Sequence, residues 1–170
     1  MIEEFNRKME VKIHKNTLSD EEAEEIIELI KTENVHTILS KLSTTLIRDY
    51  LNLAIKSDHI FLFTCKTEKK IIGYALFAEK PRYLISEFSI MKFKILLNLI
   101  KKIKFFQLIN ILISILKLDL ILLDKKHKDL IKDSLNLNLL AINKEYQSKG
   151  IGKFFFENSI QIIYQNYFKF

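Results

Sequence analysis

Two of the three glycines in this chain, Gly150 and Gly152, lie one residue apart, and Lys149 and Lys153 flank them. Glycine allows the backbone to bend tightly and lets a ligand approach the amides closely. The segment that begins at Gly150 has the pattern of a helix, whose first N–H groups lack internal partners and carry partial positive charge. Phosphate groups bind well at such a place. The residues therefore predict an anion site, in which the two lysines either add positive charge or are solvated surface residues.

Two common phosphate-binding motifs do not fit this turn. The Walker pattern G-x-x-x-x-G-K-[ST] fails because Phe154 follows Lys153. The dinucleotide pattern G-x-G-x-x-G fails because Phe155 stands where the third glycine belongs. A Gly-x-Gly pair alone is a weak indication of a ligand site, so its surroundings must decide.

The elements on both sides of the turn would place it between a strand and a helix. Leu and Asn alternate in 134–142, which predicts a strand with one buried face. A loop of about eight residues follows, and a helix is predicted from Gly150 onward.

The upstream elements are predicted from capping residues, apolar periodicity and turn residues. Ser19 or Asp20 is the expected N-cap of the first helix. In chain order we expect a strand at 11–17, a helix at 18–33, a further helix at 36–58, and two strands at 60–65 and 71–78 joined by a polar turn at Thr67 to Lys70.

The longer pattern around the glycines resembles the acetyl-coenzyme A loop of the GNAT superfamily of N-acetyltransferases. The signature of that family is Gln/Arg-x-x-Gly-x-Gly/Ala between its fourth strand and the next helix. The approach "LLAINKEYQ" is similar to the family's L-A-V-x-P-x-x-R/Q, with Lys144 where proline is common. The order of predicted elements is also similar. The matching residues are Gln147, Ser148, Lys149, Gly150, Ile151 and Gly152, with Ser148 where glycine is common.

The resemblance implies an α/β domain of the α+β kind, in which helices flank a mixed, mainly antiparallel sheet. It implies one domain over 1–170. The segment 83–132 replaces a connection that is usually short in the family, and we expect a helical insertion there, before the motif strand. The activity implied is transfer of an acetyl group from acetyl-CoA, used as a cosubstrate, to a primary amine of a small molecule such as an amino sugar. No metal is implied.

The resemblance also implies the residues that hold the coenzyme. The backbone of Leu140, Ala141 and Ile142 would bond the pantetheine arm like an added strand. The amides around the pyrophosphate would be those of Gln147, Ser148, Lys149, Gly150, Ile151, Gly152 and Lys153.

Two features depart from the family pattern. The family's fifth strand, and the tyrosine after it that often protonates the leaving thiolate, are missing, so we expect a C-terminally truncated domain. The motif strand also offers Ser134, Asn136 and Asn138 but no carboxylate as a catalytic base. The catalytic residues are therefore unknown. Glu79 is the nearest candidate, and its alternative is a solvated charge at a strand end.

Positive charge is concentrated in one segment. The chain carries a net charge of +6, yet residues 80–132 hold twelve Lys/Arg and four Asp/Glu. Three interpretations of 83–132 are open: helices packed on the domain, a lysine-rich helix on anionic lipid, or a contact with a second copy or an acceptor carrier. Nucleic acid fits poorly, because the lysines alternate with Ile and Leu. The longest charge-free run, 105–116, is too short to span a bilayer.

Composition bounds the remaining interpretations. Hydrophobic residues make up 48% of the chain, which argues against disorder. Cys65 is the only cysteine, and no apolar signal region begins the chain, so we expect a cytoplasmic protein that could bind the inner membrane face peripherally. Two alternatives to an enzyme stay open, namely a non-catalytic acetyl-CoA or anion-binding module and a membrane-surface interaction protein.

Overall fold

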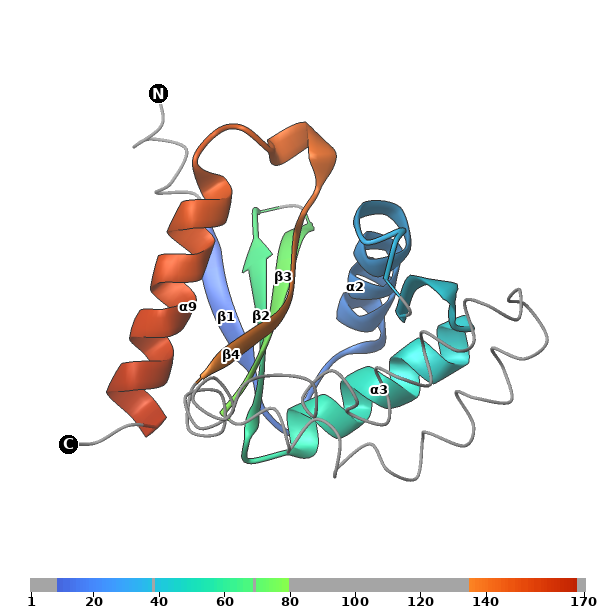
Figure 1. Ribbon diagram of the computed structural model, residues 1–170, viewed down its shortest axis with the longest axis horizontal. Coiled ribbons are helices and arrows are strands. Elements are labelled where there is room, and N and C mark those ends of the chain that lie inside the picture. The colour runs from blue at the N-terminus through green and yellow to red at the C-terminus, as the bar shows by residue number, and fades with distance from the viewer. Residues whose placement is uncertain (1–8, 38, 69, 80–134, 168–170) are drawn as a thin grey trace, which may run out of the picture.

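The computed structural model of the chain describes residues 9–37, 39–68, 70–79 and 135–167. Within these residues the fold is α+β, with one antiparallel sheet in the strand order β1-β2-β3-β4 and helices on both of its faces (Figure 1). The strands are β1 (Glu10–His14), β2 (Ile60–Lys66), β3 (Ile71–Ala78) and β4 (Asn136–Ile142), and the helices are α2 (Asp20–Glu33), α3 (Thr44–Lys56) and α9 (Ile151–Tyr167). The predicted order of elements is confirmed over these ranges, whereas the insertion predicted at 83–132 lies outside them.

Helix α2 begins where the capping residues predict. Ser19 is the N-cap, and its hydroxyl accepts a hydrogen bond from the N–H of Glu22 (3.2 Å). The carboxylate of Glu22 in turn accepts the N–H of Ser19 (3.2 Å), which completes a capping box. The apolar side of the helix is buried against the sheet and comprises Ala23, Ile26, Ile27, Leu29 and Ile30.

The continuous helix predicted over 36–58 is wrong. A short 3-10 turn at Leu39–Lys41 comes first, and α3 begins only at Thr44. Ser43 is the N-cap of α3, and its hydroxyl accepts from the N–H of Leu46 (3.4 Å). Serine is favoured at such caps because its hydroxyl can bond nearby backbone groups. In a helix interior the same bonds compete with those of the helix. Leu39 and Leu42 are nevertheless buried, which explains why the apolar spacing looked helical across the break.

The sheet separates two apolar layers. Helices α2 and α3 cover one face, where Ile26, Ile47 and Leu62 are buried together. Helix α9 covers the other face, where Phe63 and Phe155 belong to a second buried cluster (Figure 1). Alternate side chains of each strand point to opposite faces, so both faces of β2 and β3 are apolar.

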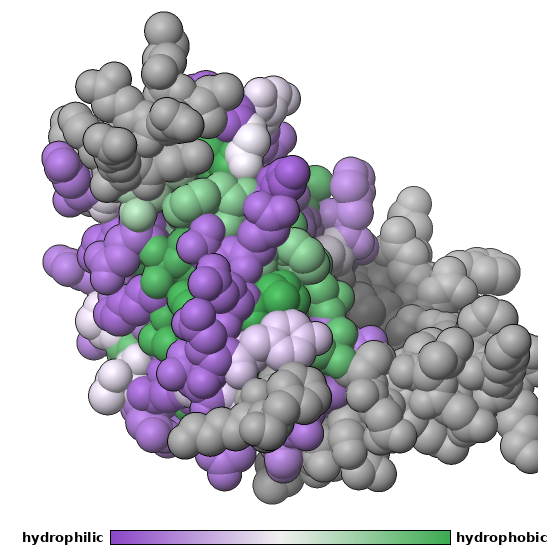
Figure 2. Space-filling view, turned by 90° about the vertical axis from the view of Figure 1, so that its left-hand side faces the viewer, coloured by the Kyte–Doolittle hydropathy of each residue, from purple (hydrophilic) through white to green (hydrophobic). Residues whose placement is uncertain are grey.

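Figure 2 views the α9 side of the molecule and shows a band of polar residues with apolar residues on both sides of it. Helix α9 carries one exposed phenylalanine, Phe156, whose exposed fraction is 38%. No helix in the described ranges is long and apolar enough to cross a membrane.

Strand β4 does not have the single buried face that its Leu–Asn alternation predicts. Leu139 pairs with Leu76, but Leu137 pairs with the adjacent Phe77, so Asn138 is an extra residue in the ladder. Such a bulge changes the facing of the residues beyond it. As a result, Leu137 is 42% exposed although the pattern places it on the buried side.

Gly73 brings the end of β4 close to β3. A Cβ atom at this position would lie 2.4 Å from Cδ1 of Ile142 and 3.0 Å from the carbonyl oxygen of Ala141. The first distance would force the end of the Ile142 side chain to move, and the second is a tight contact with backbone that would need a shift of a few tenths of an ångström. Gly73 therefore helps to set the position of the strand that leads into the Gly150 turn.

Candidate functional site

The turn between β4 and α9 has a backbone shape that favours glycine. Asn143 begins it, accepting the N–H of Glu145 on its side chain (3.0 Å) and the N–H of Tyr146 on its carbonyl (2.8 Å). Ser148 and Gly150 then adopt positive φ angles of 61° and 76°. Glycine readily adopts the positive φ angle found at position 150, which explains why this chain places one of its few glycines there.

Six consecutive backbone amides, from Ser148 to Lys153, have no hydrogen-bond partner among the described residues. Three of them belong to the first turn of α9, where helix geometry leaves N–H groups unpaired. The first bond of the helix runs from the N–H of Phe154 to the carbonyl of Gly150 (3.0 Å). These donors lie at the positive end of the α9 dipole, so the arrangement can bind an anion such as phosphate.

The two lysines beside the turn make other contacts. The ammonium of Lys149 donates to the carbonyl of Glu145 (2.8 Å) and lies 5.6 Å from the ring centroid of Tyr146. The ammonium of Lys153 lies 3.8 Å from the carboxylate of Glu157, in an exposed pair one helical turn apart. An exposed ion pair of this kind contributes little to the stability of the fold. An anion bound at this turn would therefore contact mainly backbone amides.

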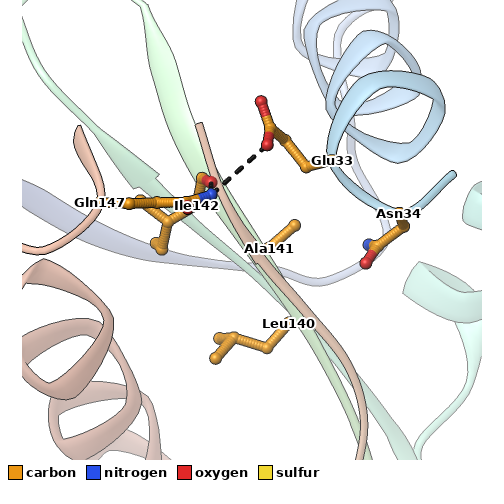
Figure 3. Close-up of a pocket in the computed structure, with 6 residues that line it drawn as sticks. All are labelled: Glu33, Asn34, Leu140, Ala141, Ile142 and Gln147. Carbon is orange, nitrogen blue, oxygen red and sulfur yellow. Dashed lines mark hydrogen bonds between the residues drawn. The ribbon is translucent and has the colours of Figure 1, made fainter. Parts of the chain in front are cut away.

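A cavity of about 260 Å³ opens beside β4, on the side of the strand that β3 does not cover (Figure 3). It brings together the last part of β4, one residue of the turn and the end of α2. Its lining residues are Glu33, Asn34, Leu140, Ala141, Ile142 and Gln147.

The backbone groups of β4 do not all face this cavity. In an antiparallel pair, successive residues point their N–H and C=O groups alternately toward and away from the partner strand. The N–H of Asn143 donates to the carbonyl of Ile72 on β3 (2.8 Å), so Asn143 faces β3. By alternation Ala141 faces β3 as well, while Leu140 and Ile142 face outward. Of the three residues predicted to bond a pantetheine arm, two therefore present backbone groups at the edge that no described strand covers, and Ala141 presents only its methyl group to the cavity.

Gln147 folds its side chain back onto β4. Its amide nitrogen donates to the carbonyl of Ile142 (2.6 Å), which confirms that this carbonyl points away from β3. The same nitrogen lies 3.4 Å from an oxygen of Glu33, as the dashed line in Figure 3 shows. The side chain of Gln147 is thus a structural link within the site.

Glu33 is a residue of the site that the sequence does not reveal. It ends α2, and its carboxylate accepts the backbone N–H of Lys144 (3.1 Å) as well as the amide of Gln147. The contacts join positions 111 and 114 residues apart. No motif or spacing marks Glu33, because only the packing of α2 beside β4 brings it there.

Asn34 connects the cavity to the core. Its amide donates a short hydrogen bond to the hydroxyl of Tyr74, a side chain of β3 that is 1% exposed. Burial raises the pKa of Tyr74 to about 12, so its hydroxyl is neutral across the physiological range. The α2 side of the cavity is therefore anchored to the middle of the sheet.

Glu79, the candidate base, lies at the opposite end of β4 from the turn. Its carboxylate is 2.6 Å from Nδ1 of His59, and its N–H donates to the carbonyl of His59 (2.9 Å). The preceding residue, Ala78, pairs with the first residue of β4, whereas Gly73 pairs with Ile142 at its last. A strand of this length spans about 20 Å at roughly 3.3 Å per residue. The structure thus places Glu79 beside the start of β4 and far from the unpaired amides of Ser148 to Lys153.

The described residues therefore bring an amide cluster, an open strand edge and a cavity together at one end of β4, and an imidazole–carboxylate pair at the other. Of the predicted turn residues, Gln147 lines the cavity together with Leu140, Ala141 and Ile142, whereas Ser148 to Lys153 are not among its lining residues. Comparison with protein-family models and with curated protein sequences gave no match to this chain.

Proposed function

We propose that the chain binds acetyl-coenzyme A at the β4–α9 turn and transfers the acetyl group to a primary amine of a small molecule, such as an amino sugar. The observation that carries this proposal is the run of six unpaired amides, Ser148 to Lys153, directly after an edge strand that borders a cavity. A pyrophosphate suits the amides. The two amide groups of a pantetheine arm suit the strand edge, because they can pair with a backbone as an added strand does.

The hydrogen-bonding groups at the edge limit how such an arm would lie. Leu140 offers both its N–H and its carbonyl, whereas the carbonyl of Ile142 already accepts from Gln147. The arm would therefore pair with Leu140 and with the N–H of Ile142, and extend from the turn toward the start of β4. The resemblance to N-acetyltransferases and the confirmed order of elements both support this direction.

The proposed reaction needs a deprotonated amine. The amine nitrogen attacks the thioester carbonyl and forms a carbon–nitrogen bond, the nitrogen gives up a proton to a base, the carbon–sulfur bond breaks, and the thiolate leaves and takes a proton. A backbone N–H of the edge strand would stabilise the oxyanion that develops. The His59–Glu79 pair, beside the start of β4, is the candidate base, because a carboxylate that holds an imidazole is a common arrangement for proton abstraction.

A second candidate function is a module that binds the coenzyme without chemistry. The observation that favours it is the distance of the His59–Glu79 pair from the amide cluster, about the length of β4. The two functions share the coenzyme site and differ only in turnover.

A charge substitution at Gly150 tests the coenzyme site. A Cβ there would meet nothing within 4 Å, and Asp and Asn both tolerate the left-handed conformation better than other residues. Gly150→Asp places a carboxylate among the amides, while Gly150→Asn adds nearly the same volume without charge. We expect calorimetry with acetyl-CoA to show binding by the wild type, weaker binding by the Asn variant and none by the Asp variant.

Equal affinity of the wild type and a folded Gly150→Asp protein would exclude this site. Turnover is then assayed with acetyl-CoA and a panel of amino sugars, polyamines and peptides, following release of the free thiol. Thiol release that depends on an amine supports the transferase. Binding without release for every amine supports the module.

A further inference from the structure

Glu33 fixes the start of the turn from outside it. This residue ends α2, and one oxygen of its carboxylate accepts the N–H of Lys144 at 3.1 Å. The other oxygen is 3.4 Å from the side-chain amide of Gln147. Figure 3 shows the carboxylate above the cavity, directed toward Gln147 and the end of β4.

Gln147 transmits this contact to the strand and to the amide cluster. Its amide also donates to the carbonyl of Ile142 at 2.6 Å, so one side chain joins α2, β4 and the turn. Ser148, the next residue, is the first of the two turn residues with positive φ and the first of the six unpaired amides. The direction of those amides thus depends on where Gln147 is held.

The charge of Glu33 is unfavourable for the ligand that the turn is proposed to bind. A carboxylate repels a nearby anion, and the repulsion is larger where water is excluded. The two hydrogen bonds that it accepts give a reason for a carboxylate at this position, because charged acceptors bond amides more strongly than neutral ones.

We propose that Glu33 is a positioning residue of the anion site, which holds Lys144 and Gln147 so that the amides from Ser148 onward converge. The role rests on the proposed function for its ligand, the pyrophosphate of the coenzyme. Its mechanical part, the ordering of the turn, can be tested without any ligand.

The ligand-free test uses ¹⁵N relaxation of the wild type, Glu33→Ala and Glu28→Ala. Glu28 lies on the same helix, is exposed, and its carboxylate has no hydrogen-bond partner among the described residues, so its variant is the control for loss of one negative charge. We expect the order parameters of Ser148, Lys149 and Gly150 to fall in Glu33→Ala and to be unchanged in Glu28→Ala. Such parameters report the picosecond–nanosecond motion of each amide.

The affinity test adds Glu33→Gln, which keeps an acceptor for the N–H of Lys144 and removes the charge. Calorimetry with coenzyme A should show binding about tenfold weaker in Glu33→Ala, equivalent to about 1.4 kcal/mol. Glu33→Gln should restore wild-type affinity or exceed it, and Glu28→Ala should not weaken it. Gln147→Ala combined with Glu33→Ala should lose less than the sum of the single losses, because both act through one network.

Several results would overturn the proposal. One is order parameters in Glu33→Ala that equal those of the wild type. A second is lower order parameters in Glu33→Ala without weaker binding of coenzyme A. A third is a Glu33→Gln protein that binds coenzyme A as weakly as Glu33→Ala. If the wild type binds no coenzyme, the proposed function fails, and the relaxation measurement alone decides whether Glu33 orders the turn.

Discussion

Gly150 and Gly152 meet different requirements although one residue separates them. Gly150 has a φ of 76° and open space around the position of a Cβ, so its need for glycine is conformational. Gly152 lies within α9, where a Cβ would make an ordinary contact with Cγ1 of Ile142 at 3.9 Å. Its backbone therefore does not require glycine, and its small size matters only to a ligand that approaches the turn.

This contrast predicts opposite stability changes for two matched variants. Gly150→Ala forces an alanine into the left-handed region and should lower the free energy of unfolding by about 1 kcal/mol. Gly152→Ala favours the helical backbone and should raise it by up to about 1 kcal/mol. Urea unfolding of both variants beside the wild type measures the two changes. Equal destabilisation by both would mean that the φ angle at Gly150 does not cause the requirement.

At the residue scale the sequence predicts what is local. Gln147 and Gly150 are recognisable because their spacing reflects the bend of one continuous segment. The contact of Glu33 with Lys144 spans 111 residues and has no pattern in the chain. The hydrogen bond from the Lys149 ammonium to the carbonyl of Glu145 could not be predicted from the sequence either, because it depends on the exact shape of the turn.

The position of the edge strand β4 depends on a bulge near its start and on a close approach to Gly73 at its end. The extra residue Asn138 turns Leu137 outward near its start, and the absence of a side chain at Gly73 lets Ile142 approach β3 near its end. The alternation of Leu and Asn predicts the strand correctly but misses the bulge, because a bulge depends on how the neighbouring strand pairs. In the same way, the apolar spacing around Leu42 hides the break before α3.

Substitution of Gly73 tests how closely β4 must approach its neighbour. Gly73→Ala should lower the free energy of unfolding by about 1–3 kcal/mol, the usual cost of overpacking, because the carbonyl of Ala141 cannot move without shifting the strand. The shifted strand should also weaken coenzyme binding, since Ile142 leads into the turn. Chemical denaturation and calorimetry on the same protein measure both effects. A variant as stable as the wild type would show that Ile142 moves aside alone.

The molecule as a whole is a sheet between two helical layers, and the sequence predicts this only in part. Apolar runs on β2 and β3 fit strands that are buried on both faces, and the structure covers each face with helices. Which helix covers which face depends on the path of the chain. In the structure α2 and α3 follow β1 on one side, and α9 returns from β4 on the other (Figure 1).

A buried histidine lies where β1 meets α2. His14 is 1% exposed, and its Nε2 lies 2.9 Å from the hydroxyl of Thr64. Its Nδ1 has no hydrogen-bond partner among the described residues and is 3.8 Å from the carboxylate of Glu22, which also accepts a bond from the ammonium of Lys12 (2.8 Å). The imidazole is thus buried beside a charged pair that caps α2.

The environments of His14 and Glu22 predict how the stability of the whole fold responds to acid. Desolvation lowers the pKa of His14 below 6.5, although Glu22 opposes it. Burial alone would raise the pKa of Glu22, but the hydrogen bonds from Lys12 and from the backbone of Ser19 outweigh it and lower this pKa from 4.5 to about 2.

Both shifts make the fold less stable in acid, in different ranges of pH. The unfolded chain protonates His14 more readily than the folded one, so stability falls as the pH drops below about 6.5. The contribution of Glu22 to stability is complete above about pH 4.5 and is lost as the pH approaches about 2.

We expect the free energy of unfolding, measured in urea, to decrease from pH 7.5 to pH 5 in the wild type and in His36→Gln, which alters an exposed histidine. His14→Gln should flatten that decrease, while Glu22→Gln should flatten the decrease below pH 4.5. If His14→Gln keeps the full dependence between pH 7.5 and 5, the buried imidazole is not its source.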